Sequence, residues 1–287
     1  MAAVLTEARR RFHQDLVEKH TLALSPDHVA SNADRCNKTS AAIALEIAKD
    51  LAASTIPKKL AGQRAGRQFE QAVARFLEQT FPSFRSLRPG NWTVSNVGGS
   101  RSGYHIAKYE PYTHLAARAR LVKEDRALAA ALGNSYQISP DIVVVRSPEP
   151  DEAINCEAEL VDADYGRHAV IRRANQDRPI VHAIVSCKWT LRSDRAQSAR
   201  TEALNLIRDR KGRTPHTVVV TGDPAPSRLA SLALGTGDID TVYHFALTEL
   251  IKAVDKTEND EAISMLDSLV QGKRLRDIAD LPLDLAV

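Results

Sequence analysis

The sequence predicts an α/β fold in which a central mixed β-sheet is flanked by helices on both faces. Three short runs, 142–145, 182–185 and 216–221, are apolar and rich in β-branched residues, as expected for buried strands. Segments with the hydrophobic spacing of amphipathic helices lie before and between these runs. Strands that alternate with helices indicate a largely parallel or mixed sheet that is covered on both sides.

Length and composition favour a single domain. The chain has 287 residues, of which 43% are hydrophobic, enough for one large hydrophobic core. We expect one domain over residues 1–287, with an N-terminal helical part at about 1–60 and an insertion at about 147–178.

The N-terminal half is predicted to be mainly helical. The apolar stripe of its clearest helix recurs with i, i+3, i+4, i+7 spacing at Phe69, Ala72, Val73, Phe76 and Leu77. The other expected elements are a helix over 9–19, a capped helix after Thr39-Ser40, a short strand over 93–97 and a long helix from about 114 to 132, stopped by Gly133. The loop 31–37 is rich in short hydrogen-bonding side chains, which is typical either of a capped turn or of a contact loop.

The C-terminal half carries most of the strands. Asp141 opens the strand 142–146, and the insertion that follows is proline-rich and acidic before a helical pattern around His168–Ala174. The strand 182–185 leads to Lys188, and Ser193 or Asp194 is expected to cap the next helix. The remaining expected elements are strands over 216–221 and 239–245, a small-residue helix between them that begins near Ser227, and helices over 248–255 and 260–271.

Charge and cysteine usage narrow the class of protein. The net charge of +3 is too mild to indicate a nucleic-acid partner, but residues 192–213 contain seven basic and three acidic side chains, a local excess of +4. Three cysteines without a C-x-x-C pair argue against a disulfide framework and against a zinc knuckle. No apolar run has the length of a signal peptide or a membrane span, so we expect a cytoplasmic protein without a membrane partner.

Asp141 and Lys188 are the first candidates for catalysis. Each lies at the end of an apolar strand, and adjacent strands of one sheet would bring these two ends together. A carboxylate in such a place suits Mg²⁺, which prefers oxygen ligands. A lysine is protonated at neutral pH, so its default role is to stabilise phosphate charge or to orient water.

Pro140-Asp141 followed by Ser186-Cys187-Lys188 resembles the active site of the PD-(D/E)xK nucleases. In that superfamily an Asp, a second acid and a Lys gather around Mg²⁺ at one edge of the sheet. Ser186 stands where the pattern has Asp or Glu. One subgroup of restriction endonucleases shares this substitution and supplies the acid from the next helix, as Lys, thirteen residues, then Glu. Thirteen residues separate Lys188 from Glu202 here.

Several further segments are similar, in order and spacing, to the NgoMIV family of type II restriction endonucleases. They are Ser186–Thr190, Arg192–Gln197, Arg210–Arg213, Pro226–Arg228, Val242–Leu247, Ser31–Asp34 and Phe69-Glu70. The resemblance implies a restriction-endonuclease-like core and a bacterial, cytoplasmic enzyme that cuts duplex DNA at GCCGGC, before the first C on each strand, leaving a 5′ overhang.

The resemblance also implies roles for the site residues. Asp141 would ligate Mg²⁺, with two ions per active site and Ca²⁺ supporting binding without cleavage; Lys188 would position the attacking water; Glu202 and Glu70 would complete the acidic shell. Ser186 would be a polar active-site residue, and Cys187 would offer its backbone carbonyl to the metal. Read without the resemblance, Glu70 is a solvated flank of an apolar stripe.

Base recognition is expected beside the catalytic lysine. Arginine pairs bidentately with guanine and a carboxylate accepts from cytosine, so Arg192, Asp194 and Arg195 suit a CCGG core. For the outer base pair the resemblance suggests Arg228 and Asp34 from the major groove and Gln63 from the minor groove. The alternative for residues 192–195 is a capped, salt-bridged helix start. Trp189 is interpreted as a packing anchor.

Two other functions remain open. One is a repair or junction nuclease of the same fold that cuts by DNA structure, and the other is a sequence-specific DNA-binding protein that does not cut. A palindromic site favours a two-fold symmetric homodimer, and the resemblance adds a homotetramer of two dimers. It also implies a companion DNA methyltransferase that acts on the same site.

Overall fold

A mixed β-sheet, with six strands among the described residues, forms the centre of the protein. The computed structural model describes residues 2–57, 60–97, 106–124, 127, 140–235 and 237–287. The strands lie in sequence order as β1 (Trp92–Asn96), β2 (Ile142–Arg146), β3 (Ile180–Lys188), β4 (His216–Thr221), β5 (Thr241–His244) and β6 (Leu275–Asp277). The pairs β1–β2 and β2–β3 are antiparallel, and β3 to β6 run parallel. The predicted mixed α/β sheet is confirmed.

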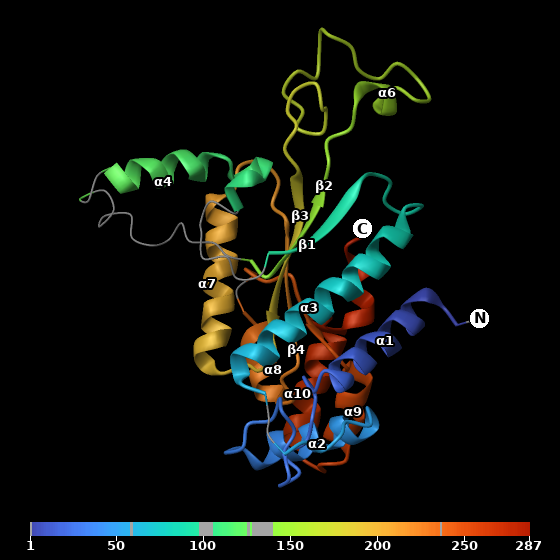
Figure 1. The fold of residues 1–287 in the computed structure, drawn as a ribbon, viewed down its shortest axis with the longest axis vertical. Helices are drawn as coiled ribbons and strands as arrows, with labels where there is room; N and C mark the ends of the chain where they lie inside the picture. The colour runs from blue at the N-terminus through green and yellow to red at the C-terminus, as the bar shows by residue number, and fades with distance from the viewer. Residues whose placement is uncertain (1, 58–59, 98–105, 125–126, 128–139, 236) are drawn as a thin grey trace.

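Helices cover both faces of this sheet (Figure 1). They are α1 (Val4–Glu18), α2 (Lys38–Asp50), α3 (Gly62–Thr80), α4 (His114–Glu124), α6 (Asp151–Ile154), α7 (Ser193–Asp209), α8 (Pro226–Ala233), α9 (Leu247–Asp255), α10 (Asp260–Gln271) and α11 (Leu281–Asp284). In the described part of the chain, 3₁₀ helices also occur at Phe81–Phe84, Ile106–Lys108, Glu110–Tyr112 and Ile278–Asp280.

The side chains of β2 show why both faces are covered. Successive residues of a strand point to opposite faces. Ile142 and Val144 join a core cluster with the apolar stripe of α3, whereas Val143 and Val145 join a second cluster with Tyr112. All four valine and isoleucine side chains are buried. A strand that is apolar at every position is therefore explained by burial on both sides.

Residues 147–178 form an arm that projects from the ends of β2 and β3 (Figure 1). The helix predicted around His168–Ala174 is wrong, because this stretch consists of turns around Arg172. The guanidinium of Arg172 donates to the Asp151 carboxylate and to the carbonyls of Asp162 and Tyr165, and the residue is 4% exposed. Satisfying a buried cation in this way holds the loop where a helix was expected.

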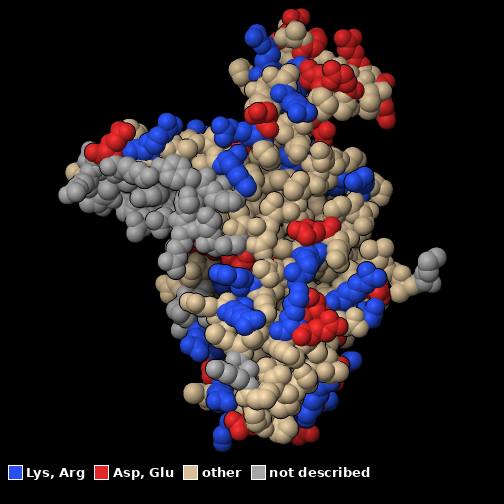
Figure 2. All heavy atoms as spheres, in the orientation of Figure 1, with Lys and Arg blue, Asp and Glu red and all other residues tan. Residues whose placement is uncertain are grey.

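The arm is acidic and carries exposed apolar side chains. Red Asp and Glu side chains are prominent on it in Figure 2, and its sequence has eight acidic against four basic residues. Leu160 and Tyr165 on the arm are 69% and 82% exposed. An acidic surface repels a phosphate backbone, so the arm is unsuited to contact DNA.

Other element boundaries differ modestly from expectation. Helix α7 begins at Ser193 with Arg192 as its N-cap residue and no capping side chain, so the predicted cap at Ser193 or Asp194 is wrong. The described part of the helix that was expected from 114 to 132 is α4, and Gly133 lies outside the described residues. The sequence analysis missed β6 and α11.

Two further sequence expectations concern cysteines and membranes. Cys36, Cys156 and Cys187 are all free. Within the described ranges, no helix combines the length and the apolar character that crossing a membrane requires.

Candidate active site

Asp141 and Lys188 meet at one edge of the sheet. Asp141 immediately precedes β2 and Lys188 ends β3, and because these strands are antiparallel the start of one lies beside the end of the other. One Asp141 oxygen, Oδ2, accepts from the backbone N–H of Cys187 at 2.7 Å and lies 3.4 Å from Lys188 Nζ. Both side chains are 17% exposed. The predicted pairing of the two strand ends is confirmed.

Lys188 stays protonated in this environment. Burial alone would lower its pKa, but the carboxylates of Asp141 and Glu202 outweigh burial and raise the pKa above its usual value. A protonated amine cannot act as a general base. Lys188 is therefore suited to stabilise negative charge or to orient a water molecule.

Glu202 reaches the same edge from α7. Its Oε2 lies 3.5 Å from the hydroxyl of Ser186, which is 7% exposed. Burial raises the pKa of Glu202 to about 7, with Lys188 opposing this rise and Asp141 adding to it. Ser186 stands where the nuclease pattern has an acid, and it faces Glu202, the acid that α7 supplies.

Glu70 approaches from α3. Burial and the neighbouring Asp141 raise its pKa to about 7, whereas Asn96, Lys188 and Arg67 lower it. Its Oε1 is buried and has no hydrogen-bond partner. The interpretation of Glu70 as a solvated flank does not fit a buried, unsatisfied carboxylate oxygen.

The donor chemistry of this cluster fits a divalent cation. Asp141 raises the pKa values of both Glu70 and Glu202, which places the three carboxylates near one another, and a carboxylate oxygen of Glu70 lacks a hydrogen-bond partner. Hard cations such as Mg²⁺ prefer oxygen ligands and retain water molecules. Among the described residues, no group of three or more His, Cys, Asp or Glu side chains is already placed to hold a metal ion. The fit therefore rests on donor type and charge.

The end of β3 is anchored by aromatic packing and by β4. Trp189 is 3% exposed and packs against Phe69 and Phe245 at centroid distances of 5.0 and 5.4 Å, which confirms it as a packing anchor. The Lys188 carbonyl accepts from the Thr221 hydroxyl at 2.8 Å and from the Gly222 N–H at 3.1 Å. These contacts fix the backbone from which the lysine projects.

The segment 192–195 begins α7, four residues after Lys188. Arg192 is exposed and has an extended backbone, which leaves its side chain accessible at the helix start. The side chains of Asp194 and Arg195 lie outside the described part of the structure. Arg195 and Glu202 share α7, as predicted, at a spacing of about 10.5 Å for seven residues.

Asp34 and Arg228 form a second candidate recognition pair. Their side chains are ion-paired with each other, and each is 28% exposed. The pKa of Asp34 is lowered by the Cys36 N–H and by Arg228, with a smaller contribution from Arg192. The structure thus brings Asp34 and Arg228 together and places Arg192 within electrostatic reach. Gln63 lies exposed in the first turn of α3.

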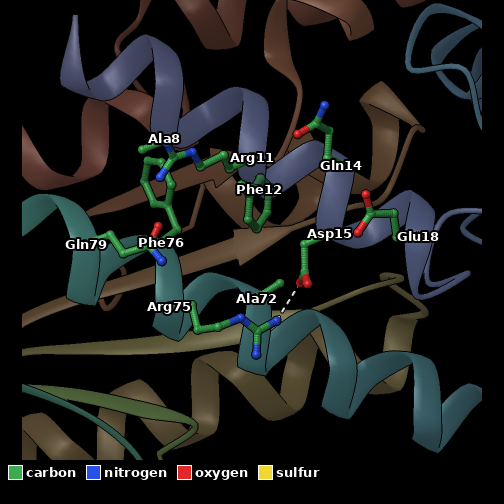
Figure 3. Close-up of a pocket in the computed structure, with 10 residues that line it drawn as sticks. All are labelled: Ala8, Arg11, Phe12, Gln14, Asp15, Glu18, Ala72, Arg75, Phe76 and Gln79. Carbon is green, nitrogen blue, oxygen red and sulfur yellow. Dashed lines mark hydrogen bonds and ion pairs between the residues drawn. The ribbon is translucent and has the colours of Figure 1, made fainter.

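A groove between α1 and α3 lies apart from this cluster (Figure 3). It has a volume of about 340 Å³, and Arg75 points across it to Asp15, with which it forms an ion pair of 2.5 Å. The apolar base comes from Phe12 and Phe76. It contains none of the sequence-predicted site residues.

Sequence reasoning missed Asp223 and treated residues 222–224 as a turn. Asp223 is 0% exposed, and its carboxylate accepts from the Leu191 N–H at 2.6 Å. The available signal was its position two residues after the apolar strand 216–221, whose last residue, Thr221, pairs with Lys188.

Comparisons with known proteins extend this description. Residues 12–287 match the model of a family described as NgoMIV restriction enzyme. The chain is 48% identical over 287 residues, all of both chains, to the type II restriction enzyme NgoMIV of Neisseria gonorrhoeae. Among solved structures it matches a complex of the restriction endonuclease PspGI with substrate DNA, at 14% identity and a TM-score of 0.27, over 99% of this chain and 92% of that one.

Proposed function

The chain belongs to the NgoMIV restriction enzyme family and is a type II site-specific deoxyribonuclease; from that premise we propose that it hydrolyses duplex DNA at GCCGGC in a Mg²⁺-dependent reaction. The cut falls before the first C of each strand and leaves a 5′ overhang. The observation that carries the proposal is the cluster of Glu70, Asp141 and Glu202 around one protonated lysine at the sheet edge.

Each member of the cluster has a role that follows from its environment. Lys188, held protonated by its acidic neighbours, orients the attacking water and stabilises charge on the phosphate. Asp141 holds Lys188 and the Cys187 backbone in place through one carboxylate oxygen. Ser186 faces Glu202 and keeps that side chain directed at the site.

Asp141, Glu70, Glu202 and the backbone carbonyl of Cys187 are the groups that would hold the metal. Bound Mg²⁺, with two ions in each site, supplies the positive charge that offsets the charge on the attacking and leaving oxygens. Ca²⁺ is expected to support DNA binding without cleavage. The raised pKa values of Glu70 and Glu202 mean that a cation competes with protons for these carboxylates.

Base recognition is proposed for the exposed side chains next to the cluster. Arg192, Asp194 and Arg195 read the central CCGG, with arginine paired to guanine and the carboxylate to cytosine. Asp34 and Arg228 read the outer base pair from the major groove, supported by their position side by side. Gln63 reads the same pair from the minor groove.

The palindromic site calls for a symmetric assembly. We propose a homodimer, in which each subunit cuts one strand, and a homotetramer of two such dimers. A companion DNA methyltransferase that modifies GCCGGC would protect the host genome.

Replacement of Lys188 tests the proposal. Lys188→Ala should abolish cleavage of plasmid DNA with Mg²⁺ and retain binding of a GCCGGC duplex in Ca²⁺, because the lysine acts on the phosphate and not on the bases. Lys252→Ala, at an exposed position of α9, serves as the matched control and should cut normally. Retained cutting by Lys188→Ala would contradict the assignment.

The same assay separates the two alternatives. Nicking that depends on DNA structure, with no discrete fragments, would indicate a repair or junction nuclease. A mobility shift on GCCGGC without any cleavage by the wild-type protein would indicate a DNA-binding protein that does not cut.

A further inference from the structure

The segment Thr221–Asp223, here called the connector, contacts the end of β3 that carries Lys188. It also contacts the two places where base recognition is proposed, the start of α7 and the pair formed by Asp34 and Arg228. It consists of the last residue of β4 and the two residues after it, and its first two residues donate hydrogen bonds to the carbonyl of Lys188. The Gly222 carbonyl accepts at 2.7 Å from the side-chain amide of Asn32, a residue that is 1% exposed and precedes Asp34 by two positions. One short segment therefore joins parts of the site that are distant in sequence.

The carboxylate of Asp223 is the centre of the connector. The residue is 0% exposed, and each of its two oxygens has a backbone partner. Oδ2 accepts from the Leu191 N–H at 2.6 Å, and Oδ1 accepts from the Ala225 N–H at 3.0 Å. The Arg228 guanidinium lies 3.6 Å from Oδ2. A buried carboxylate is costly unless such partners compensate for its lost hydration.

The two backbone partners of Asp223 are the entries to two helices. Leu191 immediately precedes Arg192, the N-cap residue of α7, and Ala225 is the N-cap residue of α8. Helix α7 carries the candidate readers of the central CCGG, and α8 carries Arg228, a candidate reader of the outer base pair. A single carboxylate thus fixes the starting points of both helices relative to each other.

We propose that Asp223 is a positioning residue for sequence discrimination, which couples the side chains that read the central CCGG to the side chains that read the outer base pair. The inference deepens the proposed function and rests on it. Asp223 does not touch the bases. It acts through Leu191, which sets the start of the segment 192–195, and through Arg228, which approaches Asp223 with one guanidinium nitrogen and Asp34 with another.

The charge arrangement supports this coupling. Arg228 lies between an accessible carboxylate, Asp34, and a fully buried one, Asp223. Burial raises the pKa of Asp223, and the two N–H groups and Arg228 counter that rise. When Arg228 binds a guanine, Asp223 still holds its guanidinium. The conformation of Arg228 and the position of Leu191 therefore depend on the same carboxylate.

Asp223→Asn tests the inference. An amide has one accepting oxygen, so the variant loses one of the two N–H contacts and the attraction to Arg228. We would measure single-turnover cleavage in Mg²⁺ of three duplex sets: GCCGGC, sites changed at the outer pair, and sites changed within CCGG. The ratio of the cognate rate to the altered-site rate should fall at least about tenfold for both altered sets, which is the size of one lost base contact.

Asp238→Asn is the matched control. Asp238 is another buried acid, 5% exposed, in the loop between α8 and β5. Both ratios should match those of the wild type. If Asp223→Asn slows all three sets equally and leaves the ratios unchanged, Asp223 has only a structural role and the inference is overturned.

A second variant covers the case in which Asp223→Asn does not fold. Arg228→Gln changes a side chain that is 28% exposed. It should reduce discrimination at the outer pair and, through Asp223, also lower the ratio for central substitutions by at least about threefold, a fraction of one direct base contact. An unchanged central ratio would overturn the coupling. A wild-type protein that neither cuts nor binds GCCGGC would instead overturn the proposed function and this inference with it.

Discussion

Replacing Glu202 with glutamine should stabilise the metal-free protein at alkaline pH while abolishing cleavage. Glu202 is largely withdrawn from solvent beside Asp141, and its pKa is raised to about 7. Above that pH the folded protein contains an ionised carboxylate that burial disfavours. Glutamine has nearly the same shape and carries no charge, so the cost of ionisation disappears.

The sign and size of the effect follow from proton linkage. The pKa of Glu202 rises from 4.5 to about 7 on folding, so the folded state binds the proton more tightly than the unfolded state. Its contribution to stability is complete below pH 4.5 and is lost as the pH rises through about 7. At about 1.4 kcal/mol per pKa unit, the rise from 4.5 to about 7 corresponds to a loss of at most about 3.5 kcal/mol. The opposing charge of Lys188 is already contained in this pKa, and partial solvent access to the side chain screens some of the cost, so we expect about 1–3 kcal/mol.

Urea unfolding monitored by tryptophan fluorescence would measure this difference. The chain has two tryptophans, and Trp189 is 3% exposed beside the site. In EDTA, Glu202→Gln should exceed the wild type in free energy of unfolding at pH 8, and by much less at pH 5. Ca²⁺ should stabilise the wild type at pH 8 more than the variant. Glu78→Gln, at an exposed position of α3, is the control and should change neither value.

A variant that is no more stable than the wild type at pH 8, or a difference that does not change between pH 5 and pH 8, would refute this reasoning. Either result would mean that burial does not raise the pKa of Glu202 in the metal-free protein.

Three further outcomes follow from the structure. Gly222→Ala should lose about 1–3 kcal/mol of stability in urea unfolding and most of its cleavage rate, because a Cβ would lie 2.5 Å from the Trp189 ring. Arg9→Ala leaves the partly buried carboxylates of Glu249 and Asp277 without their ion-pair partner, so it should lose about 2–4 kcal/mol of stability in urea unfolding. Its sequence discrimination in duplex cleavage should be unchanged. Arg228→Lys should lose about 1–3 kcal/mol of discrimination at the outer pair in competitive duplex binding with Ca²⁺, because lysine lacks the planar bidentate fork.

The elements that the sequence predicted best are those whose signal is local. Apolar β-branched runs identified β2 and β4, and the strand ends gave Asp141 and Lys188 as neighbours. Glu202 was expected in the site because of the resemblance to restriction endonucleases that supply the acid from the next helix, and it lies beside Ser186. The strands and their ends depend on periodicity and on strand adjacency, which a single sequence contains.

The features that escaped prediction depend on contacts between distant residues. The start of α7 depends on a hydrogen bond from Leu191 to Asp223, 32 positions away, and no local pattern reports that bond. The loop in place of a helix around His168–Ala174 depends on Arg172 and its partner Asp151. Strand β6 is three residues long, too short for a periodic signal.

The ends of DNA fragments produced by the wild-type protein test the central claim most directly. Genomic DNA without GCCGGC methylation would be digested in Mg²⁺, and the fragment termini would be sequenced. The account predicts termini that begin at the first C of GCCGGC with a 5′ overhang, and no cutting in EDTA. Termini without a shared sequence, or DNA left uncut in Mg²⁺, would contradict it.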